Sequence, residues 1–388
     1  MTSYDFDMLV ERRGTGSAKW EFFDADVLPM WVADMDFPSP TVIVDAIRER
    51  AAHGFFGYDF AYAELREVLV AAMQQRYNWH VQPEEFVFIP SLVTGINAVC
   101  RAVAEPGAGV ITQTPVYPPF LSAPPHHAMR TITVPLPLVS EERSISYDID
   151  FAAFEAGIDP STRLFLLCHP HNPTGVAYSR KQLERYAEIC ARHDVVICSD
   201  EIHCDLMLNG QQHTPIASLS PDIAARTITL MAPSKTYNLP GLKSGFAIVQ
   251  NPDLRRRLEQ ACEGIVPHIN IFGMLAAKLA YSQCDDWHQA LIAYLIANRD
   301  AMVGYIEREM PQIRTTVPEA TYLAWFDCRE TGIEGNPYTF FLEHARVALG
   351  DGATFGPGGE GFVRLNFACP RSMLMEALER MKNALRQA

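Results

Sequence analysis

The chain has 388 residues, of which 48% are hydrophobic and 20% are charged, a composition typical of a folded protein rather than of a disordered or fibrous one. Its 46 acidic and 32 basic side chains give a net charge of -14, which opposes binding to nucleic acid and to anionic membrane surfaces. We therefore expect neither nucleic acid nor a membrane as a partner.

The sequence predicts neither a targeting segment nor a metal site. Its start, MTSYDFDMLVERRGTGSAKW, lacks the apolar run of a signal peptide, and no stretch approaches the roughly 18 consecutive apolar residues of a membrane span. The nine cysteines are scattered, as expected for free thiols in a reducing compartment. The histidines and cysteines between positions 169 and 204 lack a second pair at ligand spacing. We expect a cytoplasmic protein without a bound metal.

Helical and strand-like segments alternate through the first two thirds of the chain. The segment YAELREVLVAAMQQRY predicts a helix with Leu65, Leu69 and Met73 on one face, and a second helix is expected from about Gly95 to Pro106. Runs that are apolar throughout are typical of strands buried on both faces, and helices between them indicate a mostly parallel sheet in an α/β fold. These runs are GVITQT, RLFLLC, VVICSD, RTITLM and GFAIVQ.

The pattern changes after about Asn251, where long helical segments lead to a mixture of short strands and helices. This change predicts a smaller α+β domain at the C-terminal end. We expect residues 1–45 to contribute to that small domain, residues 46–285 to form a large domain and residues 286–388 to form the small C-terminal domain.

Polar residues follow several predicted strands directly. HPHNPTG (169–175) comes after RLFLLC, SDEIHCD (199–205) ends VVICSD, and APSKTYNLPGLKSG (232–245) comes after RTITLM, while SLVTG (91–95) precedes a predicted helix. Ligands of open parallel sheets gather at the carboxyl ends of the strands. Lys235 lies just after the end of a buried strand, where burial of a charged side chain is unfavourable. We therefore expect it to have a chemical role.

Together with MWVADMDFPSP, PVYPPF, ATYLAWFDCR and GFVRLNFACPR, these motifs resemble one family over about residues 31–371. The chain resembles the class I and II aminotransferase superfamily of pyridoxal-phosphate enzymes, and within it the MalY/PatB-type cystathionine β-lyases, which act on cysteine S-conjugates. The resemblance implies fold type I of these enzymes, with a mostly parallel central sheet flanked by helices and a smaller α+β domain. It also implies pyridoxal 5'-phosphate as the cofactor.

The resemblance assigns roles around the cofactor ring. Lys235 would bind the cofactor covalently through its amine, and Asp200 would pair with the protonated pyridine nitrogen. Asn172 would donate to the phenolic oxygen, and His203 stands where many relatives have a tyrosine that donates to the same oxygen. Tyr117 would stack on the ring.

A second group of residues would bind the cofactor phosphate. Backbone amides at a helix start, a hydroxyl and a cation suit an anion, and the resemblance places them in this sequence. Many relatives have arginine where this chain has Lys243, and lysine lacks the bidentate geometry of arginine. The expected phosphate-binding residues are Thr94, Gly95, Ile96, Ser234 and Lys243.

The substrate and a second subunit complete the expected site. Arg364, in an otherwise apolar strand, would bind the carboxylate of an amino-acid substrate, with Ala33 and Asn172 beside it. Tyr58 matches a tyrosine that in these relatives reaches the phosphate in the neighbouring subunit, which implies a homodimer.

The resemblance implies a carbon–sulfur lyase that converts L-cystathionine or a related L-cysteine S-conjugate to a thiol, pyruvate and ammonia. Aminotransfer is the first alternative, because the same residues serve both reactions. The second alternative is a regulator that keeps the fold and binds a protein partner. Intact Lys235, Asp200, Asn172 and Arg364 argue against a regulator without catalysis.

Overall fold

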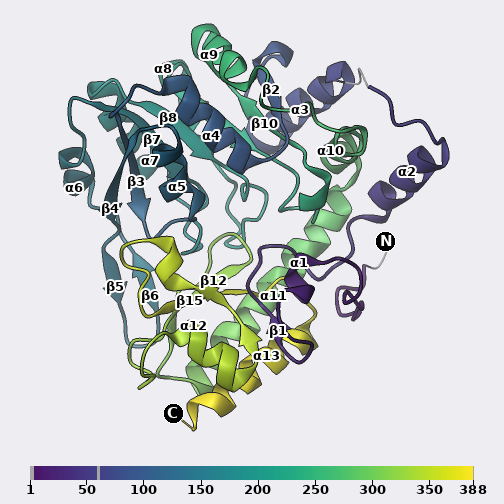
Figure 1. Ribbon diagram of the computed structural model, residues 1–388, viewed down its shortest axis with the longest axis vertical. Coiled ribbons are helices and arrows are strands. Elements are labelled where there is room, and N and C mark those ends of the chain that lie inside the picture. Colours follow the sequence, from purple (N-terminus) through teal and green to yellow (C-terminus); the bar gives the residue numbers. More distant parts are fainter. Residues whose placement is uncertain (1–3, 59–61, 388) are drawn as a thin grey trace.

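The computed structural model describes residues 4–58 and 62–387, which are organised around two sheets (Figure 1). The larger sheet has seven strands in the order β2-β10-β9-β8-β7-β3-β4. Neighbouring strands from β9 to β4 are parallel, whereas β10 is antiparallel to both β9 and β2. The predicted α/β fold with a mostly parallel sheet is therefore confirmed. The strands are β2 (Phe86–Ile89), β3 (Gly109–Thr114), β4 (Arg130–Pro135), β7 (Thr162–Cys168), β8 (Val196–Asp200), β9 (Thr227–Met231) and β10 (Gly245–Ile248).

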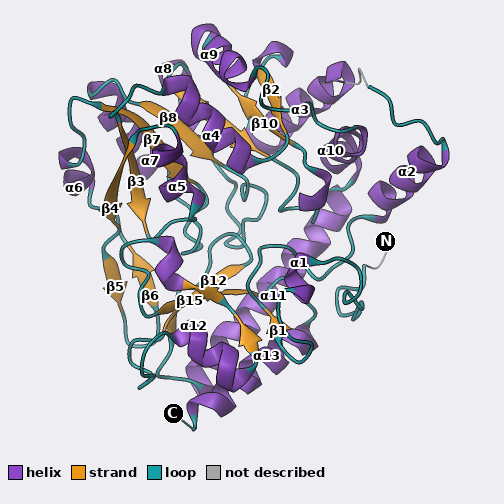
Figure 2. Ribbon diagram, in the orientation of Figure 1, coloured by secondary structure: helices purple, strands orange, loops and turns teal. Residues whose placement is uncertain are grey.

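Helices cover both faces of this sheet (Figure 2). Successive residues of β7 show why: Leu164 and Leu166 pack into the core beneath α4, α5 and α9, whereas Phe165 and Leu167 pack into the core beneath α6 and α7. A strand that is buried on both faces has no polar face, which explains its continuous apolar sequence. The helices are α4 (Leu92–Val103), α5 (Pro119–His126), α6 (Phe151–Ala156), α7 (Arg180–Arg192), α8 (Pro221–Ala224) and α9 (Pro252–Cys262).

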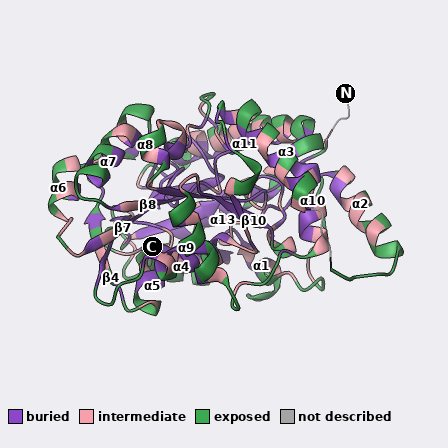
Figure 3. Ribbon diagram, turned by 90° about the horizontal axis from the view of Figure 1, so that it is seen from above, coloured by how far each residue is buried: buried purple, intermediate pink, exposed green. Residues whose placement is uncertain are grey.

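A third core lies at the β2 edge of the sheet. Leu65, Leu69 and Met73, the apolar face expected for the helix at 62–77, are buried there against Phe86 and Phe246. Figure 3 shows the strands buried in the middle of the molecule and the outer faces of the helices exposed. The helices of this edge are α2 (Thr41–Ala52), α3 (Tyr62–Tyr77) and α10 (Ile271–Gln283).

The second sheet has four antiparallel strands in the order β11-β12-β15-β14. Two long helices, α11 and α13, pack with it into one core that also contains Phe6, Met30, Met35 and Phe37 from the start of the chain. Residues near the N-terminus are thus part of the C-terminal core. The elements are α1 (Ala18–Glu21), β1 (Leu28–Pro29), β5 (Leu138–Ser140), β6 (Ile145–Tyr147), α11 (Asp285–Glu309), β11 (Arg314–Thr315), β12 (Leu323–Asp327), α12 (Pro337–Phe340), β13 (Val347–Ala348), β14 (Gly350–Asp351), β15 (Phe362–Asn366) and α13 (Arg371–Leu385).

Among the described residues, no helix combines the length and the apolar character that crossing a membrane requires. The loops that follow β7, β8 and β9 lie between the two sheets (Figure 1). Polar residues at those strand ends therefore face β15 and the N-terminal segment.

Candidate functional site

A cavity of about 370 Å³ lies where the loops after β7, β8 and β9 meet the start of α4, strand β15 and the N-terminal segment. Its walls bring together residues that are far apart in the sequence, as expected for the carboxyl end of a parallel sheet. The predicted site residues in its walls are Ala33, Tyr117, Asn172, Asp200, His203, Ser234, Lys235, Lys243 and Arg364.

Asp200 is the last residue of β8 and is buried at the floor of the cavity. Its carboxylate accepts a hydrogen bond from the backbone amide of Ile202 at 3.1 Å. Burial raises the pKa of Asp200 to about 7, although the nearby Lys235 acts in the opposite direction. Among the described residues it forms no ion pair within 4 Å. A buried carboxylate in this position has the electrostatic character to bind a cationic or protonated group.

Lys235 follows β9 and extends across the cavity toward the N-terminal segment. Its side-chain nitrogen donates a hydrogen bond to the backbone carbonyl of Ala33 at 2.6 Å. Burial lowers the pKa of Lys235 to about 8, and the positive charge of Arg364 acts in the same direction. A substantial fraction of the amine is therefore neutral near physiological pH, and a neutral amine can act as a nucleophile or as a base.

Arg364 lies in the middle of β15 and is only 7% exposed. Its guanidinium donates to the side-chain oxygen of Asn172 and to the backbone oxygen of Trp31, each at 2.9 Å, and lies 5.0 Å from the centroid of the Phe355 ring. Its Nε atom has no partner among the described residues. Burial lowers the pKa of Arg364 to about 10. A buried cation held only by neutral groups is costly, so this arrangement favours an anionic ligand.

His203 is buried beside the edge of the Tyr322 ring, and its Nδ1 atom has no hydrogen-bond partner among the described residues. Burial lowers the pKa of His203 well below its usual value, and the charges of Lys235 and Arg364 lower it further. The imidazole is therefore neutral at physiological pH. It can donate one hydrogen bond into the cavity without a change in charge.

Tyr117 lies after β3, in the wall of the cavity. Burial raises the pKa of its hydroxyl, so the ring remains uncharged. A neutral aromatic side chain at this place offers a flat face to a planar ligand.

The start of α4 differs from the prediction. The helix begins at Leu92 rather than near Gly95, because the side chain of Ser91 caps it by accepting from the Thr94 amide at 3.3 Å. Ser91 is in the cavity wall, whereas the expected residues Thr94, Gly95 and Ile96 are not. The Gly95 amide donates to the Ser91 carbonyl at 3.0 Å, and Ile96 is fully buried in the core.

The reason for a glycine at position 95 is packing. A Cβ atom at Gly95 would lie 2.5 Å from the terminal methyl group of Ile89 on β2. The residues of α4 that line the cavity are Leu92 and Val93, in its first turn. Lys243 supplies a cation on the same side.

Tyr58 lies away from the cavity of its own chain. It is 100% exposed, and Phe55 and Phe56 beside it are exposed as well. Within one chain the structure therefore does not bring Tyr58 to the other predicted site residues.

Several residues of the site have no equivalent in the sequence prediction. Trp31, Cys168 and Ser244 line the cavity, and the hydroxyl of Tyr322 donates to the Ala33 carbonyl at 3.0 Å. Trp31 and Tyr322 fall within motifs that were noted, but nothing in their spacing indicates that they contact the site. No group of three His, Cys, Asp or Glu side chains suited to a metal ion occurs in the described part of the chain.

Comparison with known proteins identifies the family of this chain. The model of the family "Aminotransferase class I and II" matches residues 25–381. Cystathionine beta-lyase PatB of Bacillus subtilis (strain 168) is 39% identical, over 98% of this chain and 100% of its own. The solved structure of the PLP-bound C–S lyase from Staphylococcus hominis is 32% identical with a TM-score of 0.91, over 99% of this chain and 98% of its own. Cystalysin from Treponema denticola, whose structure contains pyridoxal 5'-phosphate, is 30% identical with a TM-score of 0.93, over 99% of both chains.

Proposed function

The chain belongs to the family of class I and II aminotransferases, and we propose that within this family it is a pyridoxal-phosphate-dependent carbon–sulfur β-lyase of the cystathionine β-lyase type. It converts L-cystathionine or a related L-cysteine S-conjugate, with water, to a thiol, pyruvate and ammonia. The observation that carries the proposal is the buried Arg364 guanidinium, which has no carboxylate partner in residues 4–58 and 62–387 and lines the same cavity as the Lys235 amine.

The residues of the cavity fit pyridoxal phosphate. Asp200, a buried carboxylate that forms no ion pair among the described residues, suits the protonated ring nitrogen, and the flat face of Tyr117 suits the ring. Lys235 is the amine available for a covalent bond to the cofactor aldehyde. When bound, the cofactor supplies an electron sink that stabilises negative charge on the substrate's α-carbon.

The phosphate would be held at the first turn of α4. Ser91 and Ser234 offer hydroxyl groups in the cavity wall, and Lys243 offers a positive charge. The partial positive charge at a helix start favours an anion here. We infer that Thr94, at the first turn, contributes its hydroxyl, which lies 2.9 Å from that of Ser91.

The chain's own residues then orient the substrate and move its proton. Arg364 binds the α-carboxylate of the amino acid, which supplies the missing anion beside Asn172. Lys235, once released, takes the proton from the α-carbon as general base, because burial keeps part of its amine neutral. Asp200 retains its negative charge when a protonated ring nitrogen lies beside it, and the neutral His203 donates a hydrogen bond into the cavity.

We infer that the protein is a homodimer in which Tyr58 reaches the phosphate end of the neighbouring cavity. Support comes from residues 53–58, which follow α2 and expose three aromatic side chains close together in the sequence. Exposed aromatic residues at such density favour a protein interface. The three side chains are Phe55, Phe56 and Tyr58.

We also propose a cytoplasmic location, supported by nine cysteines that are all free, eight of them buried. The domain boundaries proposed from the sequence, 1–45, 46–285 and 286–388, are supported by the separate cores of the two sheets and by the packing of the N-terminal residues into the C-terminal core. Limited proteolysis followed by mass spectrometry tests these boundaries.

The function is tested with the purified protein and its Lys235→Ala variant. We expect the protein, but not the variant, to show the visible absorption band of a lysine-bound cofactor, and to release thiol and pyruvate in equal amounts from L-cystathionine. A 2-oxo acid formed from an intact amino donor, without thiol, would instead support aminotransfer. Absence of the cofactor band would refute both reactions and leave the regulator.

A further inference from the structure

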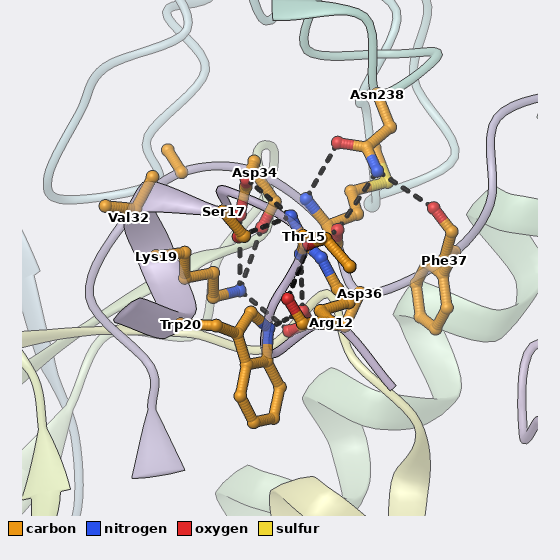
Figure 4. A network of polar contacts seen from close by, with 12 residues as sticks. Arg12, Thr15, Ser17, Lys19, Trp20, Val32, Asp34, Asp36, Phe37 and Asn238 are labelled. Atoms are coloured by element: carbon orange, nitrogen blue, oxygen red, sulfur yellow. Dashed lines mark hydrogen bonds and ion pairs between the residues drawn. The ribbon is translucent and has the colours of Figure 1, made fainter. Parts of the chain in front are cut away.

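The turn that holds Ala33 is surrounded by charged side chains, of which Lys19 and Asp36 are buried and Arg12 and Asp34 are partly buried. Figure 4 shows Arg12, Lys19, Asp34 and Asp36 in one network, which we call the N-terminal ion cluster. Lys19 is 1% exposed and lies 2.7 Å from the Asp36 carboxylate, which Arg12 also contacts, at 2.6 Å. Arg12 reaches Asp34 at 3.1 Å, and Lys19 reaches it at 3.6 Å. Two cations and two anions therefore balance within the cluster.

The cluster holds the backbone of the turn as well as its own side chains. Lys19 donates to the Asp34 carbonyl at 3.0 Å, and Arg12 donates to the Met35 carbonyl at 3.0 Å. From the other side, Asn366 of β15 donates to the carbonyls of Val32 and Asp34, at 2.7 and 2.6 Å.

The loop that carries Lys235 is tied to the same turn. The Asn238 side chain accepts from the Met35 amide at 3.0 Å and donates to the carbonyls of Met35 and Phe37, at 3.0 and 2.8 Å (Figure 4). Only two residues separate Asn238 from Lys235. The turn is thus fixed to the N-terminal segment, to β15 and to the loop after β9 at once.

Ala33 lies at the centre of this turn, and its carbonyl accepts hydrogen bonds from Lys235 at 2.6 Å and from Tyr322 at 3.0 Å. Buried ion pairs cost desolvation energy and contribute little net stability, so they are better explained by positioning than by stability. We propose that the N-terminal ion cluster is a positioning device for Lys235: it holds the Ala33 carbonyl at hydrogen-bond distance from the amine and sets the charge beside the amine when it is free of the cofactor.

The charges that face Lys235 come from four parts of the fold. Asp200 on β8 and Asp34 in the turn act to raise the pKa of the amine, whereas Arg364 on β15 and Lys19 in α1 act to lower it, after the larger effect of burial. Burial favours the neutral forms of His203, Tyr322 and Tyr117, and Lys243 lines the same cavity as a further cation. Two members of the cluster therefore act on Lys235 with opposite sign.

The opposite signs give a test that a merely structural role would fail. Asp34→Asn removes a negative charge and is expected to lower the pKa of Lys235 by about half a pH unit, whereas Lys19→Gln removes a positive charge and is expected to raise it by about as much. The double variant Asp34→Asn/Lys19→Gln is expected to lie close to the wild type. Asp327→Asn is the matched control, because Asp327 is a buried carboxylate paired with arginines on the second sheet.

The readout is competitive acetylation of the full-length, cofactor-free protein from about pH 6 to about pH 10, with the peptide that contains Lys235 quantified by mass spectrometry. The inference rests on the proposed role of Lys235, but the labelling requires neither substrate nor turnover, so its result is separate from that of the β-elimination assay. Near-ultraviolet circular dichroism shows that each variant is folded. Shifts of opposite sign with an unchanged control support the proposal, and any other pattern among folded variants overturns it. If one single variant does not fold, the other single variant and the charge-balanced double variant are compared. The proposal then requires that the pKa of Lys235 be shifted in the single variant and unchanged in the double variant.

Discussion

The side-chain nitrogen of Lys235 lies 2.6 Å from the backbone oxygen of Ala33, a residue 202 positions earlier in the chain. This contact joins the loop after β9 to a turn that Arg364 also holds, through its hydrogen bond to the Trp31 carbonyl. The amine that would react and the guanidinium that would bind the substrate are thus positioned by one short segment. Under the proposed function, displacement of the N-terminal turn would affect both groups.

Replacement of Arg364 tests the substrate site. We expect Arg364→Gln to raise KM for a cysteine S-conjugate about 100-fold, because the substrate carboxylate loses a charge-assisted pair. Arg364→Lys retains the charge but loses the bidentate geometry, so its KM should lie between those of the wild type and the glutamine variant. Steady-state kinetics with an intact absorption band are the measurement. The control is Arg329→Gln, which removes an arginine paired with Asp327 on the same sheet. An equal effect in the control would contradict the assignment.

Asp200 gives a prediction of pH-dependent stability. Burial raises its pKa to about 7 in the folded, cofactor-free protein, so the folded state binds this proton more tightly than the unfolded state. The free energy of unfolding should therefore fall as pH rises from about 4, the value for an unfolded aspartate, to about 7. Asp200→Asn removes this loss and should stabilise the cofactor-free protein by about 1–3 kcal/mol at neutral pH, with no gain near pH 4.

The measurement is denaturant unfolding across this pH range, with and without pyridoxal phosphate. With the cofactor present, the wild type should be more stable than Asp200→Asn, because the asparagine cannot form an ion pair with the protonated ring nitrogen. Asp159→Asn is a control of opposite sign, since Ser161 and Arg130 hold the pKa of Asp159 below its usual value. A stability gain in Asp200→Asn that is independent of pH would contradict the burial argument.

Much of the central sheet could be predicted because its signals are local. Strands such as β7 and β9 are buried on both faces, so their sequences are apolar throughout, and polar residues mark where they end. Asp200 and Lys235 could be placed at one edge of the sheet because parallel strands bring their carboxyl ends together. Asn172, after β7, follows the same rule.

The remaining features depend on contacts that have no periodic signal. The sequence predicts the start of α4 too late because Gly95 suggests a helix start. In the structure, position 95 is a glycine because the helix backbone lies close to Ile89. The pair of Lys19 and Asp36 spans 17 residues of irregular chain, so no spacing rule predicts it. The neutral state of His203 follows from burial and from the nearby positive charges of Lys235 and Arg364, which only the folded structure brings together.

A substitution at Gly95 tests whether packing explains the glycine at this position. Gly95→Ala would place a methyl group 2.5 Å from the Ile89 side chain, so we expect it to lower the free energy of unfolding by about 1–3 kcal/mol. Arg101→Ala, at an exposed position of the same helix, is the control and should change stability by less than about 0.5 kcal/mol. Thermal unfolding with the cofactor band as a second signal is the measurement. If Gly95→Ala left stability intact but weakened cofactor binding, a direct phosphate role for this residue would be favoured instead.

The shared active site of the proposed homodimer predicts complementation between two inactive variants. Tyr58 would act in the neighbouring subunit's cavity, whereas Lys235 acts in its own, so a hybrid of Tyr58→Ala and Lys235→Ala subunits has one cavity with both residues intact. Mixing the two variants under conditions that exchange subunits should restore up to about a quarter of wild-type activity, because about half of the dimers are hybrids with one of two sites complete. Analytical ultracentrifugation of each variant establishes the oligomeric state. Mixing Lys235→Ala with Asp200→Asn is the control: each change affects the cavity of its own subunit, so neither cavity of a hybrid is complete. If the Tyr58 mixture stayed as inactive as this control while both variants were dimers, Tyr58 would not act across the interface.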